Sequence, residues 1–222
     1  SVDRVKVGLT DFSGDARDNG SKLMSAQKRL SHLELLSNTM LDTLANSGAE
    51  IDDTPFILKA QEAMRSIALA VERGVDEGEL SIEAVFDRDY KLIEGSNPAQ
   101  YDTGFCDYAD AHVRPILDRF KGSDERIIGS AITDVNGYLP THLSERSHAP
   151  GPDPVWNDEH CRNKRIFMDE TTRNACNSDK PARLATYRME LGDKFIAVKN
   201  VFVPLFIKGR RWGNFELAYR DD

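Results

Sequence analysis

The stretch Asp134-Val-Asn-Gly-Tyr138-Leu-Pro-Thr-His142 follows a run of mostly apolar and β-branched residues at positions 127–133. Such a run favours a β-strand. The Asn136-Gly137 pair then predicts a tight turn, because glycine adopts positive φ without a Cβ clash and asparagine does so at little cost. The turn carries Tyr138 and His142 just beyond the end of the strand, where functional side chains are often presented.

Four strands are predicted in all, one before and three after a long connection. They cover Arg126–Thr133, Leu184–Glu190, Phe195–Ile207 and Gly213–Arg220. Lys208-Gly209-Arg210 joins the last two strands as a compact hairpin turn, which predicts an antiparallel sheet. Pro204 lies inside the longest strand and indicates a bulge or an edge position there, because proline has no N–H to donate.

The segment from Leu139 to Lys180 is too long for a hairpin connection, and it contains Pro150-Gly-Pro-Asp-Pro154. We expect this insertion to fold over one face of the sheet and to leave a ligand pocket beneath it. Because the predicted helices precede the sheet along the chain, the fold class is α+β.

A helix is predicted from Ser21 to Gly48, after a polar lead-in at residues 1–19. Its apolar face advances in alternating steps of three and four residues, which is a heptad seam. The seam consists of Leu23, Ala26, Leu30, Leu33, Ser37, Met40 and Leu44. It predicts a homodimer through paired helices, or alternatively an amphipathic helix packed on its own domain. We assign residues 1–50 to the lead-in and this helix, and residues 51–222 to the folded domain.

Two more helices are expected before the sheet. In the first, Thr54 is a candidate N-cap, Pro55 suits the first turn, and Gly74 ends the helix. The second runs over about Thr103–Phe120, with Pro115 inside it. Proline cannot donate the helical hydrogen bond, so Pro115 predicts a kink or a restart.

Composition limits the classes of partner. The chain has 222 residues and a net charge of −8, which argues against nucleic acid and against direct contact with an anionic membrane. The sequence contains no apolar run long enough to span a bilayer and no signal-peptide pattern at its start. Cys106, Cys161 and Cys176 are an odd number of cysteines without the spacing of a disulfide framework, which favours a reducing, cytoplasmic compartment.

Several short motifs occur one after another along the chain. They are Phe86-Asp87-x-x-Tyr90 with Gly95-Ser-Asn-Pro98, then Asp134 to His142, Trp156-Asn157, Cys161-Arg-Asn-Lys-Arg165-Ile-Phe-Met-Asp169, Ala185-Thr-Tyr-Arg188 and Lys208 to Gly213. This order resembles the PAS/Cache-like sensory domain of bacterial methyl-accepting chemotaxis proteins, from about Thr54 to Tyr219. The resemblance implies a PAS/Cache-like antiparallel sheet and a signal-input domain that binds a small molecule. It also implies a dimeric helical stalk connected to the chemotaxis signalling machinery.

The sequence departs from the family pattern at three places. Leu143 follows His142 where the family often has asparagine, Arg211 replaces a histidine before Trp212, and Leu184-Ala185 replaces a more usual Leu-Gln. Because these positions fall in the expected pocket, the resemblance does not identify the ligand.

Arginine side chains are the main candidates for ligand binding, because a guanidinium group matches a carboxylate with two parallel hydrogen bonds. The predicted ligand-binding residues are Tyr138, His142, Arg162, Arg165, Tyr187, Arg188, Arg211 and Trp212. Together they would suit a small organic anion with an apolar part. In the alternative interpretation, the arginines pair with Asp134, Asp169 and Glu190 and only tie the insertion to the sheet.

The insertion contains four side chains that could bind a metal or haem: His142, His148, His160 and Cys161. These residues lack the spacing of a closed zinc site, and no C-x-x-C-H motif for covalent haem is present. We therefore expect no metal and no cofactor. The alternative is a haem or redox sensor that uses non-covalent haem with His142 as axial ligand, or Cys161 as the reactive group.

No catalytic motif is recognised. The sequence lacks a P-loop, a G-x-G-x-x-G fingerprint and a nucleophile elbow, and adjacent His160 and Cys161 side chains would point apart. We therefore expect a non-enzymatic, cytoplasmic, dimeric signal-input domain. A third alternative is a module that holds no ligand and serves only dimerisation or docking.

Overall fold

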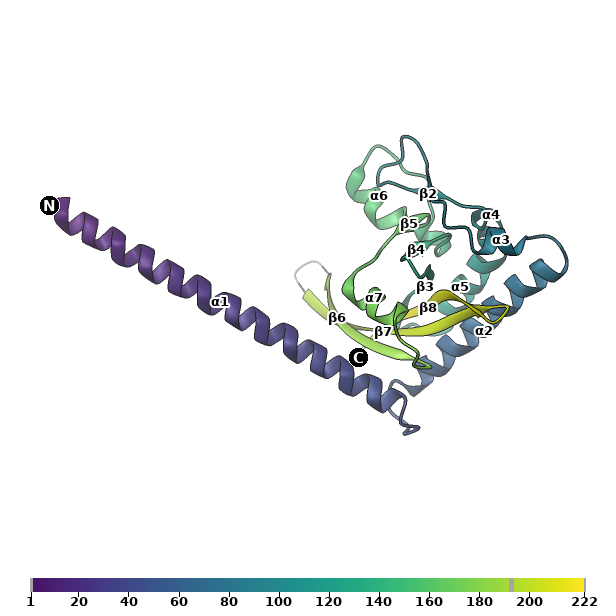
Figure 1. Cartoon of the computed structure of the whole chain (residues 1–222), viewed down its shortest axis with the longest axis horizontal. Coiled ribbons are helices and arrows are strands. Elements are labelled where there is room, and N and C mark those ends of the chain that lie inside the picture. The colour runs from purple at the N-terminus through teal and green to yellow at the C-terminus, as the bar shows by residue number, and fades with distance from the viewer. Residues whose placement is uncertain (1, 192–193, 222) are drawn as a thin grey trace. The chain divides into compact units, whose positions relative to one another are not determined.

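The computed structural model describes the backbone of residues 2–191 and 194–221, and the side chains of residues 16–187 and 196–221. The chain divides into two units, residues 1–40 and 41–222. The first unit is part of one long helix, and the second contains the sheet and the other helices (Figure 1). Within the described residues, no helix is long and apolar enough to cross a membrane.

The elements follow one another in the order that the sequence predicts, helices first and sheet afterwards. The helices are α1 (Val2–Ala45), α2 (Thr54–Asp76), α3 (Ile82–Val85), α4 (Cys106–Tyr108), the π-helix η1 (Ala109–Val113), α5 (Arg114–Lys121), the 3-10 helix η2 (Ser144–Arg146), α6 (Pro154–His160) and α7 (Glu170–Cys176). The strands are β1 (Lys91–Leu92), β2 (Tyr101–Asp102), β3 (Ile127–Asp134), β4 (Tyr138–Leu139), β5 (Arg165–Ile166), β6 (Arg183–Leu191), β7 (Lys194–Ile207) and β8 (Arg210–Arg220). The α+β class is thereby confirmed.

The main sheet has four antiparallel strands in the order β3-β8-β7-β6, which confirms the four predicted strands. Lys208 and Gly209 both have positive φ, as the predicted β7–β8 hairpin turn requires. Pro204 pairs with Asn214 of β8. On its other side β7 is paired with β6, but β6 begins at Arg183, opposite Phe202, and does not reach Pro204. Pro204 therefore has a strand on one side only and needs no second hydrogen-bonding partner.

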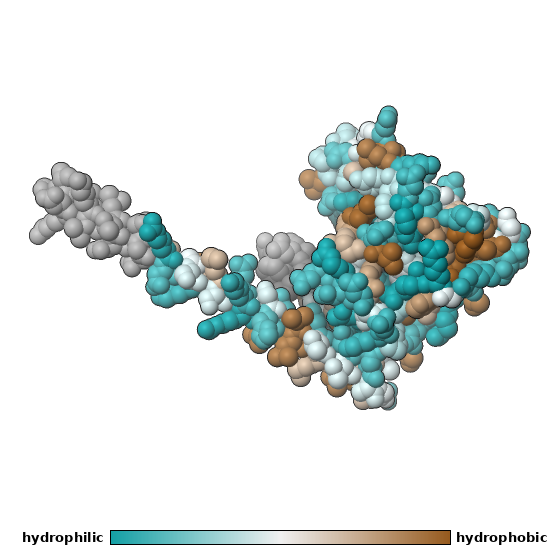
Figure 2. All heavy atoms as spheres, viewed as in Figure 1, coloured by the Kyte–Doolittle hydropathy of each residue, from teal (hydrophilic) through white to brown (hydrophobic). Residues whose placement is uncertain are grey.

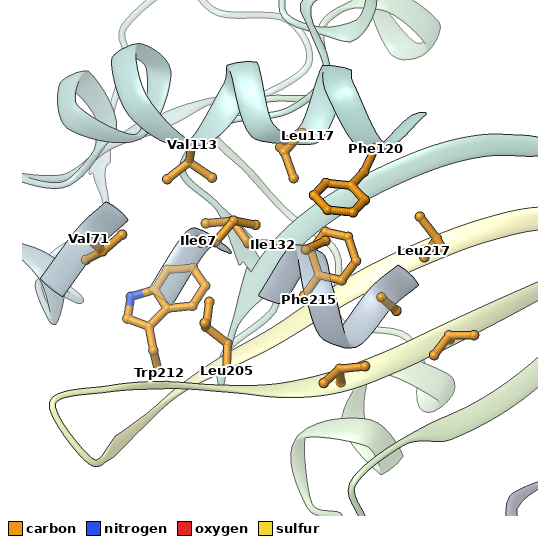
Figure 3. Close-up of a cluster of buried hydrophobic side chains, with 14 of the residues drawn as sticks. Ile67, Val71, Val113, Leu117, Phe120, Ile132, Leu205, Trp212, Phe215 and Leu217 are labelled. Atoms are coloured by element: carbon orange, nitrogen blue, oxygen red, sulfur yellow. The ribbon is translucent and has the colours of Figure 1, made fainter. Parts of the chain in front are cut away.

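One face of the sheet packs against α2 and α5 to form the hydrophobic core (Figure 3). Alternate residues of each strand supply this face, because side chains of a strand point to opposite sides in turn. The central side chains are Ile67 and Val71 of α2, Val113, Leu117 and Phe120 of the η1–α5 segment, Ile132 of β3, Leu205 of β7, and Phe215 and Leu217 of β8. The other face of the sheet is left for the insertion.

The start of α2 differs in detail from the prediction. The N-cap position is Asp53 rather than Thr54, whose hydroxyl instead accepts a hydrogen bond from the N–H of Ile51 at 2.8 Å. The Asp53 carboxylate makes no capping hydrogen bond. It accepts hydrogen bonds from Lys199 Nζ at 2.9 Å and from the Tyr219 hydroxyl at 2.8 Å. Asp53 therefore ties the helix start to β7 and β8.

The third predicted helix forms, but it is divided. It begins at Cys106 rather than Thr103 and passes through the π-helical turn Ala109–Val113 before α5 restarts at Arg114. The restart fits Pro115, which cannot donate to the carbonyl one turn earlier, so the turn before it is widened.

The predicted lead-in at residues 1–19 is wrong in its secondary structure, because α1 already begins at Val2. The first twenty residues contain glycines, each of which costs a helix about 1 kcal/mol, but no proline that would end it. The helix ends at Ala45, and Gly48 then takes a positive φ of 80°.

The last turn of α1 is fixed to the sheet within the second unit. Asp42 is 2% exposed, and its carboxylate accepts the Leu184 N–H at 2.8 Å and pairs with Arg183 Nε at 3.0 Å. Asn46 donates to the Ala182 carbonyl at 2.9 Å. The beginning of β6 is thus held by the end of α1.

The turn after β3 is organised by the buried Asp134 carboxylate. One oxygen accepts the N–H groups of Asn136 at 2.7 Å and Tyr138 at 3.0 Å, and the other accepts the Tyr90 hydroxyl at 2.6 Å. Arg88 Nε lies 3.1 Å from the same second oxygen, so the buried charge is paired. This network fixes the point at which the insertion leaves the sheet.

Strand β8 can pair closely with β3 at Asp134 because the residue opposite Asp134 is Gly213, which has no side chain. A Cβ at Gly213 would lie 1.9 Å from the Thr133 carbonyl oxygen and 2.5 Å from the Asp134 Cα. We predict that Gly213→Ala lowers the free energy of unfolding by about 1–3 kcal/mol or more, since overpacking against backbone forces strands apart. Urea denaturation followed by circular dichroism measures the loss.

Gly129→Ala is the matched control, because a Cβ at Gly129 would lie 3.7 Å from the Ala218 Cβ, an ordinary contact. Its effect should stay below about 1 kcal/mol. Equal effects of the two substitutions would show that the close approach at Gly213 is not a constraint on the fold.

Candidate functional site

A cavity of about 620 Å³ lies between the sheet and the insertion, where the sequence predicts a pocket. All four strands of the main sheet contribute to its lining, for example through Ala131, Tyr187, Phe202 and Glu216. In the register of the sheet, Phe202 stands opposite Glu216, and Glu216 stands opposite Ala131. These three side chains therefore share the sheet face opposite the hydrophobic core.

The insertion closes the cavity from the other side. It contributes His142, Arg146, Arg162 and Phe167, together with residues around the start of α7. The α7 helix packs on the same sheet face through Ala175, which contacts Ala185 and Phe202. The lining thus combines cationic, apolar and acidic groups.

Arg162 is the main cationic group of the cavity. Its guanidinium carbon lies 4.6 Å from the centre of the Phe167 ring, and no ion pair of Arg162 occurs among the described residues. Burial lowers the pKa of this guanidinium, and the nearby charges of Arg165 and Arg146 lower it further. A buried cation among other positive charges is stabilised when an anion binds beside it.

His142 adds a neutral hydrogen-bond donor beside this cation. Its Nδ1 accepts the Leu143 N–H at 2.7 Å, so the proton of the neutral ring lies on Nε2. Burial, followed by the charges of Arg162 and Arg146, lowers the pKa of His142 to about 3. The ring is therefore neutral at physiological pH.

This arrangement of His142 does not fit an axial haem ligand. An iron-bound Nε2 carries no proton, and the proton would move to Nδ1, where it would oppose the Leu143 N–H donor. No group of three or more potential metal-binding side chains is arranged around an ion in the described part of the chain.

Arg146 lies at the rim, and it is already paired. Its Nη1 donates to the Glu159 carbonyl at 2.9 Å and lies 3.4 Å from the Glu159 carboxylate. Both residues line the cavity. The pair leaves Arg162 as the cation that is open to a ligand.

A second, acidic side of the cavity is formed on β8. Glu216 accepts a hydrogen bond from the Thr133 hydroxyl, and burial raises the pKa of its carboxyl to about 7. Asn200 lies beside it, and within the described part of the chain the buried Asn200 Oδ1 has no hydrogen-bond partner. Glu216 and Asn200 both line the cavity, and their side-chain oxygens can accept hydrogen bonds there.

Two predicted arginines have structural roles instead. Arg165 is outside the cavity lining and pairs with Asp158 at 2.9 Å. Arg211 donates to the carbonyls of Gly213 and Ser178 and to Asn214 Oδ1, which ties β8 to the segment after α7. The partners of these two arginines differ from the carboxylates Asp134, Asp169 and Glu190 that the alternative interpretation names.

Two predicted aromatic residues also lie outside the cavity. Tyr138 is buried and donates from its hydroxyl to the Tyr101 carbonyl at 2.6 Å. Trp212 is 1% exposed and donates to the Val85 carbonyl at 2.8 Å within the helical core. Of the remaining predicted residues, Tyr187 lines the cavity, whereas the Arg188 side chain falls outside the described residues.

A β-bulge explains the position of Trp212. Leu205 of β7 pairs with Gly213 and Phe206 pairs with Arg211, so Trp212 is an extra residue in β8. The extra residue reverses the alternation and turns the indole to the core side.

Several lining residues were not predicted, chiefly Arg146, Asn200, Phe202 and Glu216. The alternation in β8 carries a signal for Glu216, because it lies between the apolar residues Phe215 and Leu217 and must face the other side of the strand. Only knowledge that the insertion covers this face would identify it as a lining residue.

None of the cysteines has the surroundings of a catalytic thiol. Cys161 is 0% exposed, and burial raises the pKa of its thiol. The Cys106 thiol lies 3.0 Å from the Tyr138 hydroxyl, and burial raises its pKa as well. Thiols in such surroundings are poor nucleophiles.

The raised pKa of Glu216 predicts a pH-dependent stability. Between about pH 4.5 and about pH 7 the folded chain keeps a proton on Glu216 that the unfolded chain loses, so this group makes the free energy of unfolding fall as pH rises. We predict that Glu216→Gln removes this part of the pH dependence, as measured by urea denaturation at several pH values. A difference between the two proteins that is constant over this range would contradict the assignment.

Comparison with known proteins finds similarity in structure only. No protein-family model matches the chain, and no curated protein does. Among solved structures, the sensory domain of the Campylobacter jejuni chemoreceptor Tlp3 (CcmL) with isoleucine bound has 10% identity and a TM-score of 0.43, and the match covers 87% of this chain and 62% of that one. The E. coli DcuS sensor domain has 15% identity and a TM-score of 0.32, with 72% and 90% covered.

A methyl-accepting chemotaxis protein X has 15% identity and a TM-score of 0.32, with 76% of this chain and 63% of that chain covered. The chain thus spans 62% of the length of the Tlp3 domain. The first two similar structures are described as a sensory domain and a sensor domain, and the third as a methyl-accepting chemotaxis protein. At such identities and TM-scores the similarity concerns shape and carries no argument about the ligand.

Proposed function

We propose that this chain is a signal-input domain of a bacterial methyl-accepting chemotaxis receptor and that it binds a small organic anion in the cavity beneath the insertion. The proposal is supported most directly by Arg162, a cavity-lining guanidinium without a carboxylate partner among the described residues. A cation held in partly buried surroundings without a counter-ion is destabilising on its own, and a bound anion would relieve that cost.

The surroundings of Arg162 indicate the shape of the ligand. His142 Nε2–H adds a donor for the same anionic group, whereas Phe167, Leu143 and Phe202 offer apolar surface. A ligand pocket of this kind combines a mainly apolar wall with a few polar groups that fix orientation. We therefore favour a carboxylate with an apolar body over a highly charged anion.

A physical connection leads from the cavity to α1. Arg183 Nη1 donates to the Asn174 carbonyl of α7 at 2.8 Å, and Arg183 Nε pairs with Asp42 at 3.0 Å. The α7 helix begins at the cavity wall, where Asp169 caps it and lines the cavity. We propose that occupancy of the cavity reaches the end of α1 through this joint, provided that the ligand binds two arrangements of it with different affinity.

The proposal includes a homodimer formed through α1. Leu23, Leu30, Leu33 and Met40 of the predicted seam are each at least 59% exposed within the single chain. Figure 2 shows the part of this helix surface that faces the viewer, where hydrophobic and hydrophilic side chains are interspersed. A second copy of the same helix would cover the seam in the manner of a coiled coil.

The remaining parts of the proposal concern placement and chemistry. The three cysteines are free thiols, which supports a reducing and therefore cytoplasmic compartment. We propose that the domain has no catalytic activity and passes its signal to the chemotaxis machinery through the rest of the receptor.

A thermal-shift screen tests the binding site. We predict that at least one of acetate, propionate, hexanoate, succinate and benzoate raises the melting temperature of the purified chain. A ligand at about 100 times its Kd adds about 2.7 kcal/mol to the free energy of unfolding. Arg162→Ala should weaken this binding by about 10- to 100-fold, because it removes a charged hydrogen-bonding partner.

Arg165→Ala is the matched control, because its guanidinium stacks on the same Phe167 ring at 4.6 Å but pairs with Asp158 outside the cavity. It should leave the shift unchanged. Haemin is included in the screen, and a visible absorbance band with no response to any carboxylate would replace this proposal by the haem sensor. Absence of any shift would favour a docking module.

Sedimentation equilibrium tests the homodimer. We predict that the chain is dimeric at micromolar concentrations and that Leu30→Glu with Leu33→Glu makes it monomeric, because two charges in the seam oppose pairing. Leu35→Glu is the control, since Leu35 is 54% exposed but lies off the seam. A monomeric wild type, or dissociation by Leu35→Glu alone, would contradict pairing through this face.

A further inference from the structure

Glu216 places a carboxyl group in the same cavity as the proposed anion site. It lies on β8, within the sheet face that forms the floor, while Arg162 reaches the cavity from the insertion. No ion pair of Glu216 occurs among the described residues, and its hydrogen-bonded neighbour Thr133 is a neutral hydroxyl. An anion that binds Arg162 must therefore share the cavity of about 620 Å³ with this carboxyl group.

The charged and titratable groups around Glu216 come from each element packed against it. Asp169 at the start of α7 raises the pKa of Glu216, and Arg162 lowers it. Tyr187 of β6 and Cys176 of α7 also lie near enough for the charge of Glu216 to raise their pKa values. Among the main influences on the pKa of Glu216, the cation is Arg162, whose charge the ligand would neutralise.

Two negative charges cannot occupy this space without a large cost, because like charges in low-dielectric surroundings repel strongly. We propose, on the basis of the function proposed above, that a monocarboxylate bound at Arg162 draws one proton from solvent onto Glu216. The carboxylate of Glu216 and a solvent proton become a neutral carboxylic acid. The Thr133 hydroxyl stays on Oε1, so the proton is accepted by Oε2, which can then donate a hydrogen bond to the ligand or to Asn200 Oδ1.

The consequence is a site whose response depends on both ligand and pH. Burial already raises the pKa of Glu216 to about 7, so little proton uptake is needed below that pH. Above it, each unit of pH should weaken the apparent affinity for a monocarboxylate by about tenfold, because binding then requires one extra proton. A receptor with this site would report carboxylate less strongly in alkaline conditions.

His142 is another group in the cavity that could take up a proton. It lies beside Arg162 and Arg146, whose charges oppose a second cation, and its Nδ1 already accepts a backbone N–H. If His142 were the proton acceptor, the pH dependence of binding would survive the removal of Glu216. Substitution of Glu216 therefore distinguishes proton uptake by Glu216 from proton uptake by His142.

Isothermal titration calorimetry of the full chain with benzoate, propionate and hexanoate tests the inference. Each titration is run between about pH 6 and about pH 8.5, in two buffers of different ionisation enthalpy, so that the number of protons taken up is measured directly. These acids are fully ionised in this range. We expect uptake to rise towards one proton above about pH 7 and the affinity to fall about tenfold per pH unit there.

Glu216→Gln keeps the shape of the side chain and a partner for Thr133, and it should bind without proton uptake and with an affinity that does not change with pH. Glu77→Gln, which removes an exposed carboxylate after α2 and outside the cavity lining, should behave like the wild type. Arg162-dependent binding without proton uptake, or uptake that persists in Glu216→Gln, would overturn this inference and leave the anion site intact. Absence of binding by all three acids at every pH would overturn both.

Discussion

The buried carboxylate of Asp134 is the constraint on which the functional half of the domain depends. It accepts hydrogen bonds from two backbone N–H groups and from Tyr90, and Arg88 balances its charge. Because a buried carboxylate is costly unless it is fully partnered, the turn can take few other forms. Arg88 also donates to the Trp212 carbonyl at 3.0 Å, so the same network joins the β3 turn to the bulge in β8. The insertion starts from this fixed point, and the roof of the cavity is positioned by it.

The sheet separates structural from functional side chains by its alternation. On one face, apolar residues pack on α2 and α5 and form the core. On the other, Phe202 and Glu216 meet the insertion, which brings Arg162 and His142 to the same cavity. The cavity consequently has a cationic side and an acidic side, and this asymmetry is the basis for both the proposed anion site and the proposed uptake of a proton. The contact between Arg183 and Asp42 provides a path from this cavity to the end of α1.

Most of the fold could be predicted from the sequence, because the strands have a clear alternation and Pro55 marks the first turn of α2. The predicted end of α2 at Gly74 was wrong, since the helix continues to Asp76. The site could be predicted only in part. Arg162 and Arg165 look equivalent in sequence, but Lys164 between them has a φ of 59°, and this left-handed residue redirects the backbone so that only Arg162 lines the cavity. The bulge at Trp212 likewise has no signal in the residue pattern, since it arises from the pairing of two strands. Glu216 required knowledge of which face the insertion covers.

The central claim is that Arg162, which has no carboxylate partner among the described residues, binds an anion. A crystal structure of the chain with bound benzoate, or with the carboxylate that stabilises it most, tests this claim most directly. The account predicts that the ligand carboxylate lies within hydrogen-bonding distance of the Arg162 guanidinium, with His142 Nε2 directed at the same group and the apolar part against Phe167. A structure in which Arg162 instead pairs with Asp169 or Glu216 and fills the cavity, with no ligand between them, would contradict it.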